Sequence, residues 1–256
     1  RRFRGEFVLR IGIDIGSTAA KAAAFDGDGL VTTAVVPTGF NGVDAALRLA
    51  DELRGLGIDP MASGASVVAT GYGRVSVPYA GKTVTEITCH GRGAAWLFGG
   101  DGCVIDVGGQ DTKVIQLAGG KVRKFVMNDK CAAGTGKFLE VIADRMGVTQ
   151  GELASLAAAG EPTSISSMCT VFAESEVISL IGKGEPRENI ANGVIESVVV
   201  KVASLAGSLV TGDVFLTGGL CGNAYVIERL AHHLARPVIT DERARFAGAI
   251  GAALSA

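Results

Sequence analysis

The sequence predicts an α/β protein made of two similar lobes. A unit of strand, Asp, glycine turn and strand occurs twice, with its aspartates at Asp14 and Asp106. Strand-like and helix-like segments alternate along the chain, which is typical of the α/β class. The 256 residues are 48% hydrophobic and include 37 glycines, as expected of a turn-rich protein with a large core. The repeat indicates two lobes rather than one continuous sheet.

The first lobe opens with an apolar, β-branched run at Val8–Ile15 that ends in a Gly-Ser-Thr turn. Strands are predicted at 19–25 and 30–36, joined by the tight turn Asp26-Gly27-Asp28-Gly29. We therefore expect a β-hairpin at the start of this lobe, which we assign to residues 1–102. Its later elements are predicted as a helix over 41–56, a strand over 65–70 and a helix over 85–98.

The second lobe repeats this design. Cys103–Val107 is an apolar strand containing Asp106, and a glycine turn follows it. We assign residues 103–240 to this lobe and expect the closing segment 241–256 to pack back on the first. Strands are predicted over 114–117, 121–127, 214–216 and 238–240, and helices over 137–146, 150–159, 170–181, 190–209, 223–234 and 245–254.

Charge and hydropathy exclude several classes of protein. A formal net charge of −2 gives no reason to expect nucleic acid as a partner. No stretch approaches the roughly 18 uninterrupted apolar residues of a membrane span. The basic start Arg1–Arg4 is followed by a segment that holds Asp14 and two glycines, which makes a poor signal peptide. The five cysteines are an odd, widely spaced set rather than a disulfide framework, so we expect a cytoplasmic protein.

Both Asp-containing turns have the composition of a phosphate-binding loop. Glycine lets backbone N–H groups approach phosphate oxygens, while a neighbouring carboxylate can hold hydrated Mg²⁺. A single turn of this kind could merely connect two strands, but two matching turns and a third glycine turn at 217–222 favour a nucleotide site. The candidates in the first turn are Gly16, Ser17, Thr18 and the cation Lys21, and those in the second are Gly108, Gly109 and the polar Gln110 and Asp111.

Two common nucleotide motifs are missing from the sequence. It has no G-x-x-x-x-G-K-[ST], so this is not a P-loop, and no G-x-G-x-x-G opens a helix after the first strand. The segments 11–18, 104–109 and 214–220 instead resemble the two phosphate motifs and the adenosine motif of the actin, sugar-kinase and heat-shock ATPase superfamily. The resemblance implies two actin-like (ribonuclease H-like) lobes around a nucleotide cleft. It also implies that Asp14 and Asp106 organise Mg²⁺ through water, that Gly218 and Gly219 face the adenosine, and that Gln110 or Asp111 orients the attacking water.

Cys131 and Cys169 each precede a predicted amphipathic helix. A helix N-terminus lowers the pKa of a thiol and stabilises bound anions. Neither cysteine has a C-x-x-C neighbour, so one chain cannot offer four thiolates from these two positions. Two copies related by a two-fold axis could do so. The plainer alternative, that they are ordinary packed cysteines, stays open at this point; Cys89, Cys103, Cys221 and His90 are interpreted in that plainer way.

Four segments carry a closer resemblance: 71–74, 86–90, 128–138 and 164–179. They are similar to the activators of 2-hydroxyacyl-CoA dehydratases, in the BadF/BadG/BcrA/BcrD ATPase family. The resemblance implies a homodimer with one bridging [4Fe–4S] cluster, held by Cys131 and Cys169 of each subunit. It further implies ATP-driven transfer of one electron from ferredoxin or flavodoxin to a dehydratase.

Three other functions remain as alternatives. A benzoyl-CoA reductase would use the same module as its ATPase subunit. A small-molecule kinase would need a substrate-binding insertion, for which 256 residues leave little room. An ATP-dependent chaperone or scaffold would carry no iron.

Overall fold

The computed structural model describes residues 9–166 and 169–256. Val8, with which the first strand is predicted to begin, lies outside the described residues, as do Ser167 and Met168 before Cys169. The chain divides into two compact units. Unit 1 holds the described part of Arg1–Gly100 with Leu117–Val122 and Phe246–Ala256, and unit 2 holds Asp101–Gln116 and Arg123–Arg245.

The sheet of unit 1 has the strand order β3-β2-β1-β4-β5. Strand β1 pairs antiparallel with β2 and parallel with β4, which gives the hairpin predicted from the sequence and one crossover. The strands are β1 (Leu9–Ile15), β2 (Ala19–Asp26), β3 (Gly29–Pro37), β4 (Ala65–Thr70) and β5 (Lys82–Thr83).

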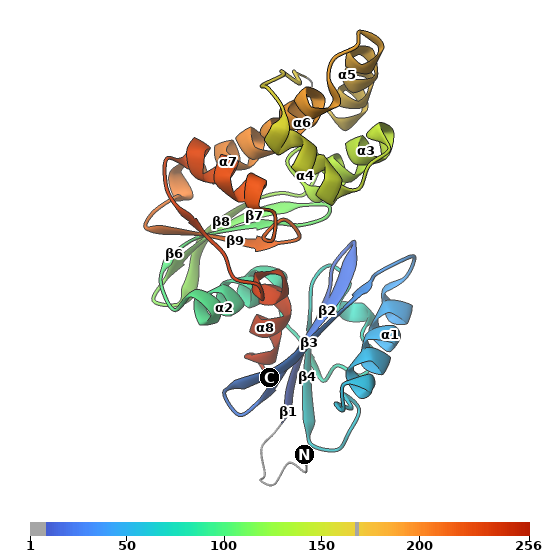
Figure 1. The fold of residues 1–256 in the computed structure, drawn as a ribbon. Helices are drawn as coiled ribbons and strands as arrows, with labels where there is room; N and C mark the ends of the chain where they lie inside the picture. The colour runs from blue at the N-terminus through green and yellow to red at the C-terminus, as the bar shows by residue number, and fades with distance from the viewer. Residues whose placement is uncertain (1–8, 167–168) are drawn as a thin grey trace. The chain divides into compact units, whose positions relative to one another are not determined.

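Helices cover both faces of this sheet (Figure 1). Because strand side chains alternate between faces, Ile11, Ile13 and Ile15 pack with α1 (Gly42–Gly55) on one side. Phe25 lies on the other face and packs with residues of α8 (Ala247–Ala253) and of α2 (Glu86–Phe98).

The sheet of unit 2 repeats this arrangement, with the strand order β10-β9-β6-β7-β8. Strand β6 pairs parallel with β9, and β9 pairs parallel with β10, as β1, β4 and β5 do in unit 1. The internal repeat predicted from the two Asp-containing turns is thus a repeat of strand order as well. The strands are β6 (Gly102–Val107), β7 (Thr112–Ala118), β8 (Lys121–Asn128), β9 (Asp213–Gly218) and β10 (Val238–Ile239).

A helical layer packs around α6 (Arg187–Ala206) in unit 2. This helix has the length and hydropathy of a membrane span, but most of it is buried inside the unit, as in the core helix of a globular protein. Its apolar side chains Ile190, Val194 and Val198 are therefore explained by packing. Its neighbours are α3 (Gly136–Met146), α4 (Gln150–Ala159), α5 (Thr170–Gly182) and α7 (Ala224–Leu234).

The predicted helices and longer strands are confirmed, with shifts at some ends. The helix predicted over 190–209 runs over Arg187–Ala206 and stops where Gly207 adopts a positive φ. The closing helix is shorter than predicted because Ala244–Phe246 forms a 3₁₀ turn before it. The two-residue strand β5 is not predicted, since it is too short for an alternating pattern to be visible.

Candidate nucleotide site and cysteine loops

Asp14 lies near the end of β1 in unit 1 and is buried, with an exposed fraction of 4%. Its register partner on β2 is Lys21, so the two residues of the predicted first turn face each other across the hairpin. The turn between them is held by the Gly16 N–H, which donates to the Ala19 carbonyl at 3.2 Å. Ser17 and Thr18 are exposed at its tip, where their hydroxyls can reach a ligand.

Gly71 and Gly248 pack directly against the Asp14 carboxylate. Gly71 has φ +87°, and a Cβ there would lie 2.4 Å from Asp14 Oδ1 and 2.6 Å from the Ile15 carbonyl oxygen. A Cβ on Gly248 would lie 2.4 Å from Asp14 Oδ2 and 2.9 Å from His90 Cε1. Only glycine fits at these positions. Both Asp14 and His90 pack against Gly248.

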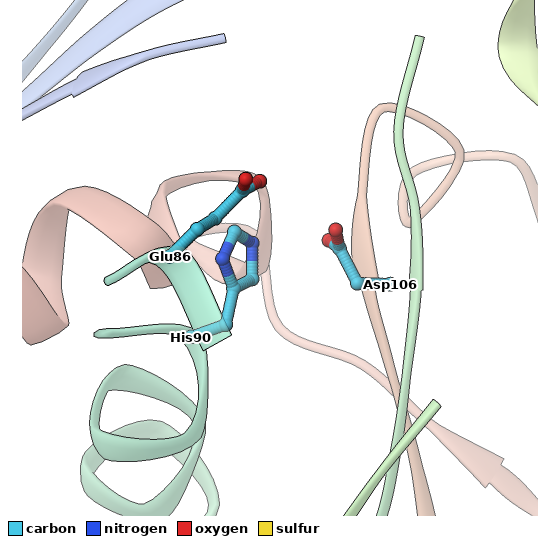
Figure 2. A group of neighbouring side chains, drawn as sticks. All are labelled: Glu86, His90 and Asp106. Atoms are coloured by element: carbon cyan, nitrogen blue, oxygen red, sulfur yellow. The ribbon is translucent and has the colours of Figure 1, made fainter. Parts of the chain in front are cut away.

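Glu86 and His90 lie one turn apart on α2 and project from the same side of the helix (Figure 2). Their ligand atoms lie within 4.8 Å of each other, and His90 is buried. Asp106, drawn in the same figure, belongs to unit 2.

Asp106 is the counterpart of Asp14 in unit 2, on β6, and is 3% exposed. The Thr217 hydroxyl donates to its Oδ1 at 2.9 Å from the neighbouring strand β9. Gly218 follows with φ +86°, and a Cβ there would lie 2.8 Å from the same oxygen. The second Asp-containing turn and the glycine turn at 217–222 therefore meet at the Asp106 carboxylate.

Lys113 is buried beneath the second turn. Its Nζ lies 2.7 Å from Asp111 Oδ2 and 3.6 Å from Asp106 Oδ2. Asp111 in turn packs on the turn itself, because a Cβ on Gly108 would lie 2.6 Å from Asp111 Oδ1. The Gly108 N–H also donates to the Asp111 carbonyl at 2.9 Å, whereas the neighbouring Gln110 is exposed.

The second turn is hydrogen-bonded to the start of α3. The Gly136 N–H donates to the Gly108 carbonyl at 2.9 Å, and the Lys137 N–H donates to the Gly109 carbonyl at 2.8 Å. These donors are two of the first amides of α3, which have no partner within the helix. The second turn and the start of α3 are therefore held together through their backbones.

Cys131 lies in the loop that leads into α3 and is exposed. Asn128 Nδ2 donates to the carbonyls of Cys131 and Ala133 at 2.9 and 2.8 Å. The buried Thr112 hydroxyl, two residues after Gln110, donates to the Gly134 carbonyl at 2.6 Å. The loop with Cys131 is thus fixed to two strands, β8 through Asn128 and β7 through Thr112.

Cys169 is exposed and is the N-cap residue of α5. The helices that follow the two cysteines, α3 and α5, pack together and are joined by the ion pair of Arg145 and Glu174. The other cysteines, Cys89, Cys103 and Cys221, are all buried. Burial raises the pKa of the Cys89 thiol and raises that of Cys103 to about 11, so both remain protonated at neutral pH.

A cavity of about 580 Å³ adjoins the glycine turn at 217–222 within unit 2. Gly219 lines both this cavity and a neighbouring one of about 660 Å³. The first is lined on other sides by α4 and α7, and its polar side chains include Gln150, Tyr225 and Glu228. This volume and mixture of apolar and polar groups suit a small organic ligand.

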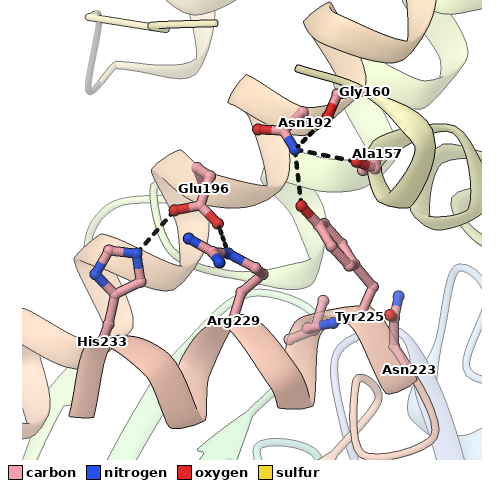
Figure 3. A network of polar contacts seen from close by, with 9 residues as sticks. Ala157, Gly160, Asn192, Glu196, Asn223, Tyr225, Arg229 and His233 are labelled. Carbon is pink, nitrogen blue, oxygen red and sulfur yellow. Dashed lines mark hydrogen bonds and ion pairs between the residues drawn. The ribbon is translucent and has the colours of Figure 1, made fainter. Parts of the chain in front are cut away.

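A network of polar contacts holds the cavity wall on α7 against α6 (Figure 3). Asn192 Nδ2 donates to the Tyr225 hydroxyl at 2.7 Å and to the carbonyls of Ala157 and Gly160 at 3.0 and 3.3 Å. Glu196 on α6 accepts from Arg229, further along α7, and lies 2.8 Å from His233 Nε2 on the same helix as Arg229.

The structure distributes the predicted site residues over the two units. The sequence places Lys113 at the end of the second turn, at the same distance from Asp106 as Lys21 from Asp14, and Thr217 at the start of the third glycine turn, but it does not indicate their contacts with Asp106. Tyr225 is not singled out by the sequence. Unit 1 holds Asp14, Gly16, Ser17, Thr18 and Lys21, and unit 2 holds Asp106, Gly108, Gly109, Gln110, Asp111, Gly218, Gly219, Cys131 and Cys169.

Comparison with solved structures gives the same fold. Component A of the (R)-2-hydroxyglutaryl-CoA dehydratase of Acidaminococcus fermentans matches with a TM-score of 0.92 and 40% identity over 97% of both chains. The activator of the 2-hydroxyisocaproyl-CoA dehydratase of Clostridium difficile, solved with bound ADPNP, matches with a TM-score of 0.90 and 38% identity, over 97% of this chain and 94% of that one. These neighbours confirm the predicted actin-like α/β fold.

Curated relatives agree with the structural neighbours. The activator of lactoyl-CoA dehydratase of Anaerotignum propionicum is 44% identical over 96% of both chains. One subunit of the benzoyl-CoA reductase of Thauera aromatica is 33% identical, over 96% of this chain and 92% of the relative. A family model also matches residues 11–256, and the chain therefore belongs to the BadF/BadG/BcrA/BcrD ATPase family.

Proposed function

We propose that this ATPase is a one-electron donor. In this proposal ATP hydrolysis drives electron transfer from a [4Fe–4S] cluster, shared by the two subunits of a homodimer, to a 2-hydroxyacyl-CoA dehydratase. The observation that carries it is the hydrogen-bonded connection of the second phosphate turn, at Gly108 and Gly109, to the loop and helix that follow Cys131.

The nucleotide is bound by the paired turns. The buried carboxylates of Asp14 and Asp106 suit hydrated Mg²⁺, and the glycine amides of both turns suit phosphate oxygens. Gly218 and Gly219 would face the adenosine, and Gly219 lines the cavity beside their turn. The remaining ligands are the first-turn groups Gly16, Ser17, Thr18 and Lys21 together with Gly108 and Gly109 of the second.

Gln110 is the better candidate of the two residues that could orient the attacking water. Its side chain is exposed at the tip of the second turn. The Asp111 carboxylate is engaged by Lys113 at 2.7 Å and packs on Gly108, which suits a role in fixing the turn.

The two exposed cysteines fit the ligand set of a cluster shared between subunits. Each lies next to exposed apolar side chains, Val171 and Phe172 after Cys169 and Met127 before Cys131, which a second copy of the chain could cover. Two thiolates from each subunit make the four that such a cluster requires. When bound, the cluster would supply a reversible one-electron centre.

The same contacts explain how nucleotide would act on the cysteines. Closing of the Gly108–Gly109 turn on a phosphate would pull on the amides of Gly136 and Lys137 and so move the start of α3. The ion pair between Arg145 and Glu174 would pass this movement on to α5, which starts at Cys169.

The partners follow from this role. Reduced ferredoxin or flavodoxin would supply the electron in the cytoplasm, and the dehydratase would accept it. A benzoyl-CoA reductase is the second candidate acceptor, because one of the relatives is a component of such an enzyme. The higher identity to a dehydratase activator favours the dehydratase.

Anaerobic purification tests the proposal. We expect about four iron and four sulfide per dimer, an electron paramagnetic resonance signal after reduction, and a change in that signal when ATP is added. Cys131→Ser and Cys169→Ser should each lose the iron, while Cys103→Ala, which changes a buried cysteine, should keep it. An ATPase that is fully active and free of iron in the wild type would refute the proposal.

A further inference from the structure

Tyr225 and Glu228 lie three residues apart on α7 and both line the 580 Å³ cavity. Residues at this spacing lie on the same side of a helix, so the wall that α7 forms carries both a phenol and a carboxylate. Asn223 caps this helix by accepting from the Val226 N–H at 3.0 Å, which fixes the turn on which both residues stand.

Asn192 determines which way the Tyr225 hydroxyl can donate. Asn192 Nδ2 faces the carbonyls of Ala157 and Gly160, and the reversed amide would place Oδ1 against those two carbonyl oxygens. The amide nitrogen is therefore the group that lies 2.7 Å from the Tyr225 hydroxyl. Because that hydroxyl accepts from Asn192, its own hydrogen remains to be donated to a ligand.

The charges nearby keep this pattern in place. Burial raises the pKa of Tyr225, and the negative charge of Glu228 acts in the same direction, so the phenol stays protonated at neutral pH. Glu228 is exposed to the cavity, and when ionised its carboxylate can only accept hydrogen bonds. The wall therefore offers one donor and one acceptor, one helical turn apart on α7.

This pair matches one edge of adenine. Adenine presents the acceptor N7 beside the donor N6–H₂, whereas guanine presents two acceptors, N7 and O6. A carboxylate opposite guanine O6 would place two acceptors against each other. We propose that Tyr225 and Glu228 are the residues that select adenine over guanine nucleotides, with Asn192 as a positioning residue behind Tyr225.

The proposal rests on the nucleotide function proposed above and adds which residues recognise the purine base. It makes different predictions for the two residues. Tyr225 would donate to N7 of either purine, so its loss should weaken both nucleotides alike. Glu228 would accept only from adenine, and a glutamine there could donate to guanine O6, so Glu228→Gln should change the preference itself.

Steady-state hydrolysis of ATP and GTP by the purified full-length protein tests this, together with calorimetric titration of ADP and GDP. We expect Glu228→Gln to reduce the ATP-to-GTP ratio of kcat/KM by about tenfold, through KM. Tyr225→Phe should raise KM for both nucleotides about fivefold with kcat little changed. Asn192→Ala should raise KM for both nucleotides by less than Tyr225→Phe does, and Tyr225→Phe should raise KM by a smaller factor in the Asn192→Ala background than in the wild type.

Glu52→Gln makes the same chemical change on the exposed face of α1 and should leave kcat/KM for both nucleotides unchanged. Equal use of ATP and GTP by the wild type, or a ratio in Glu228→Gln within twofold of the wild type, would overturn the proposal. These assays need no iron, so failure of the electron-transfer proposal would appear separately, as an iron-free protein that still distinguishes ATP from GTP.

Discussion

Lys113 and Asp111 form an ion pair of 2.7 Å beneath the second phosphate turn, with the lysine side chain 2% exposed and the aspartate 27% exposed. A lysine buried to this degree must be paired, because an isolated charge in the interior is strongly unfavourable. In unit 1 the matching residue Lys21 is half-buried. The two turns of the repeat therefore differ, and the second is the more firmly held.

Replacement of Lys113 by methionine should destabilise the protein by roughly 3 kcal/mol, because the Asp106 and Asp111 carboxylates would lose their shared cation. ADP affinity should fall as well, since the turn is built on Asp111. Urea unfolding and ADP titration check both effects. Lys137→Met breaks the exposed pair with Glu140 and should cost less than about 1 kcal/mol. Equal losses in the two variants would contradict the buried-pair interpretation.

Gly71→Ala should impair both folding and Mg-nucleotide binding. The added Cβ would overlap the Ile15 backbone and the Asp14 carboxylate, neither of which can move freely. Gly57 has nearly the same φ, +85° against +87°, but nothing lies within 4 Å of its Cβ position. Gly57→Ala therefore shows the cost of the positive φ alone, about 1–2 kcal/mol.

The comparison of these two variants isolates the contact with Asp14. We expect the free energy of unfolding of Gly71→Ala to fall by at least about 1 kcal/mol more than that of Gly57→Ala. Affinity for Mg-ADP should fall only in Gly71→Ala. The interpretation would be wrong if both variants lost the same stability and kept the same affinity.

The sequence predicts much of this fold because its strongest patterns are local. The apolar run before Asp14 and the glycine turn after it identify a strand and a hairpin within a few residues, and the same pattern returns at Asp106. The membership of Leu117–Val122 in unit 1 cannot be recognised from any local pattern, because it depends on contacts with residues distant in the chain.

The same reason limits what the sequence reveals about the site. Asp106 and Asp111 are recognisable beside glycines, but Thr217 reaches Asp106 across 111 positions of sequence. Asn192 and Tyr225 are likewise 33 positions apart and belong to helices whose sequences show only packing. Residues that act through a partner on another element are visible only once the fold brings them together.

Asn192→Ala should lower the stability of unit 2. The side chain is 5% exposed, and its loss would remove the donor that Asn192 gives to the Gly160 carbonyl and to the Tyr225 hydroxyl, whereas the Ala157 carbonyl would keep the Gly160 N–H at 3.2 Å. Each such loss costs about 1–3 kcal/mol. Thermal and urea unfolding should both report the change. Asn189→Ala, one turn earlier on α6, removes contacts with Glu185 and with the exposed Glu161 N–H and should cost less.

Glu196 should give unit 2 a stability that depends on pH in the acid range. Burial alone would raise the pKa of Glu196, but hydrogen bonds from Arg229 and His233 outweigh it and lower the pKa below its ordinary value of 4.5. The folded protein therefore favours the ionised carboxylate more than the unfolded chain does. The resulting stability is fully present above pH 4.5 and is lost as the pH falls through the lowered pKa.

Glu196→Gln removes this contribution. The difference between the free energies of unfolding of wild type and Glu196→Gln should shrink as the pH falls from about 5 toward about 3. Urea unfolding at half-unit steps of pH measures it, with Glu52→Gln on α1 as a control that should show no such convergence. A difference that persists unchanged to the acid end of this range would mean that the ionised form of Glu196 is not the one stabilised by Arg229 and His233.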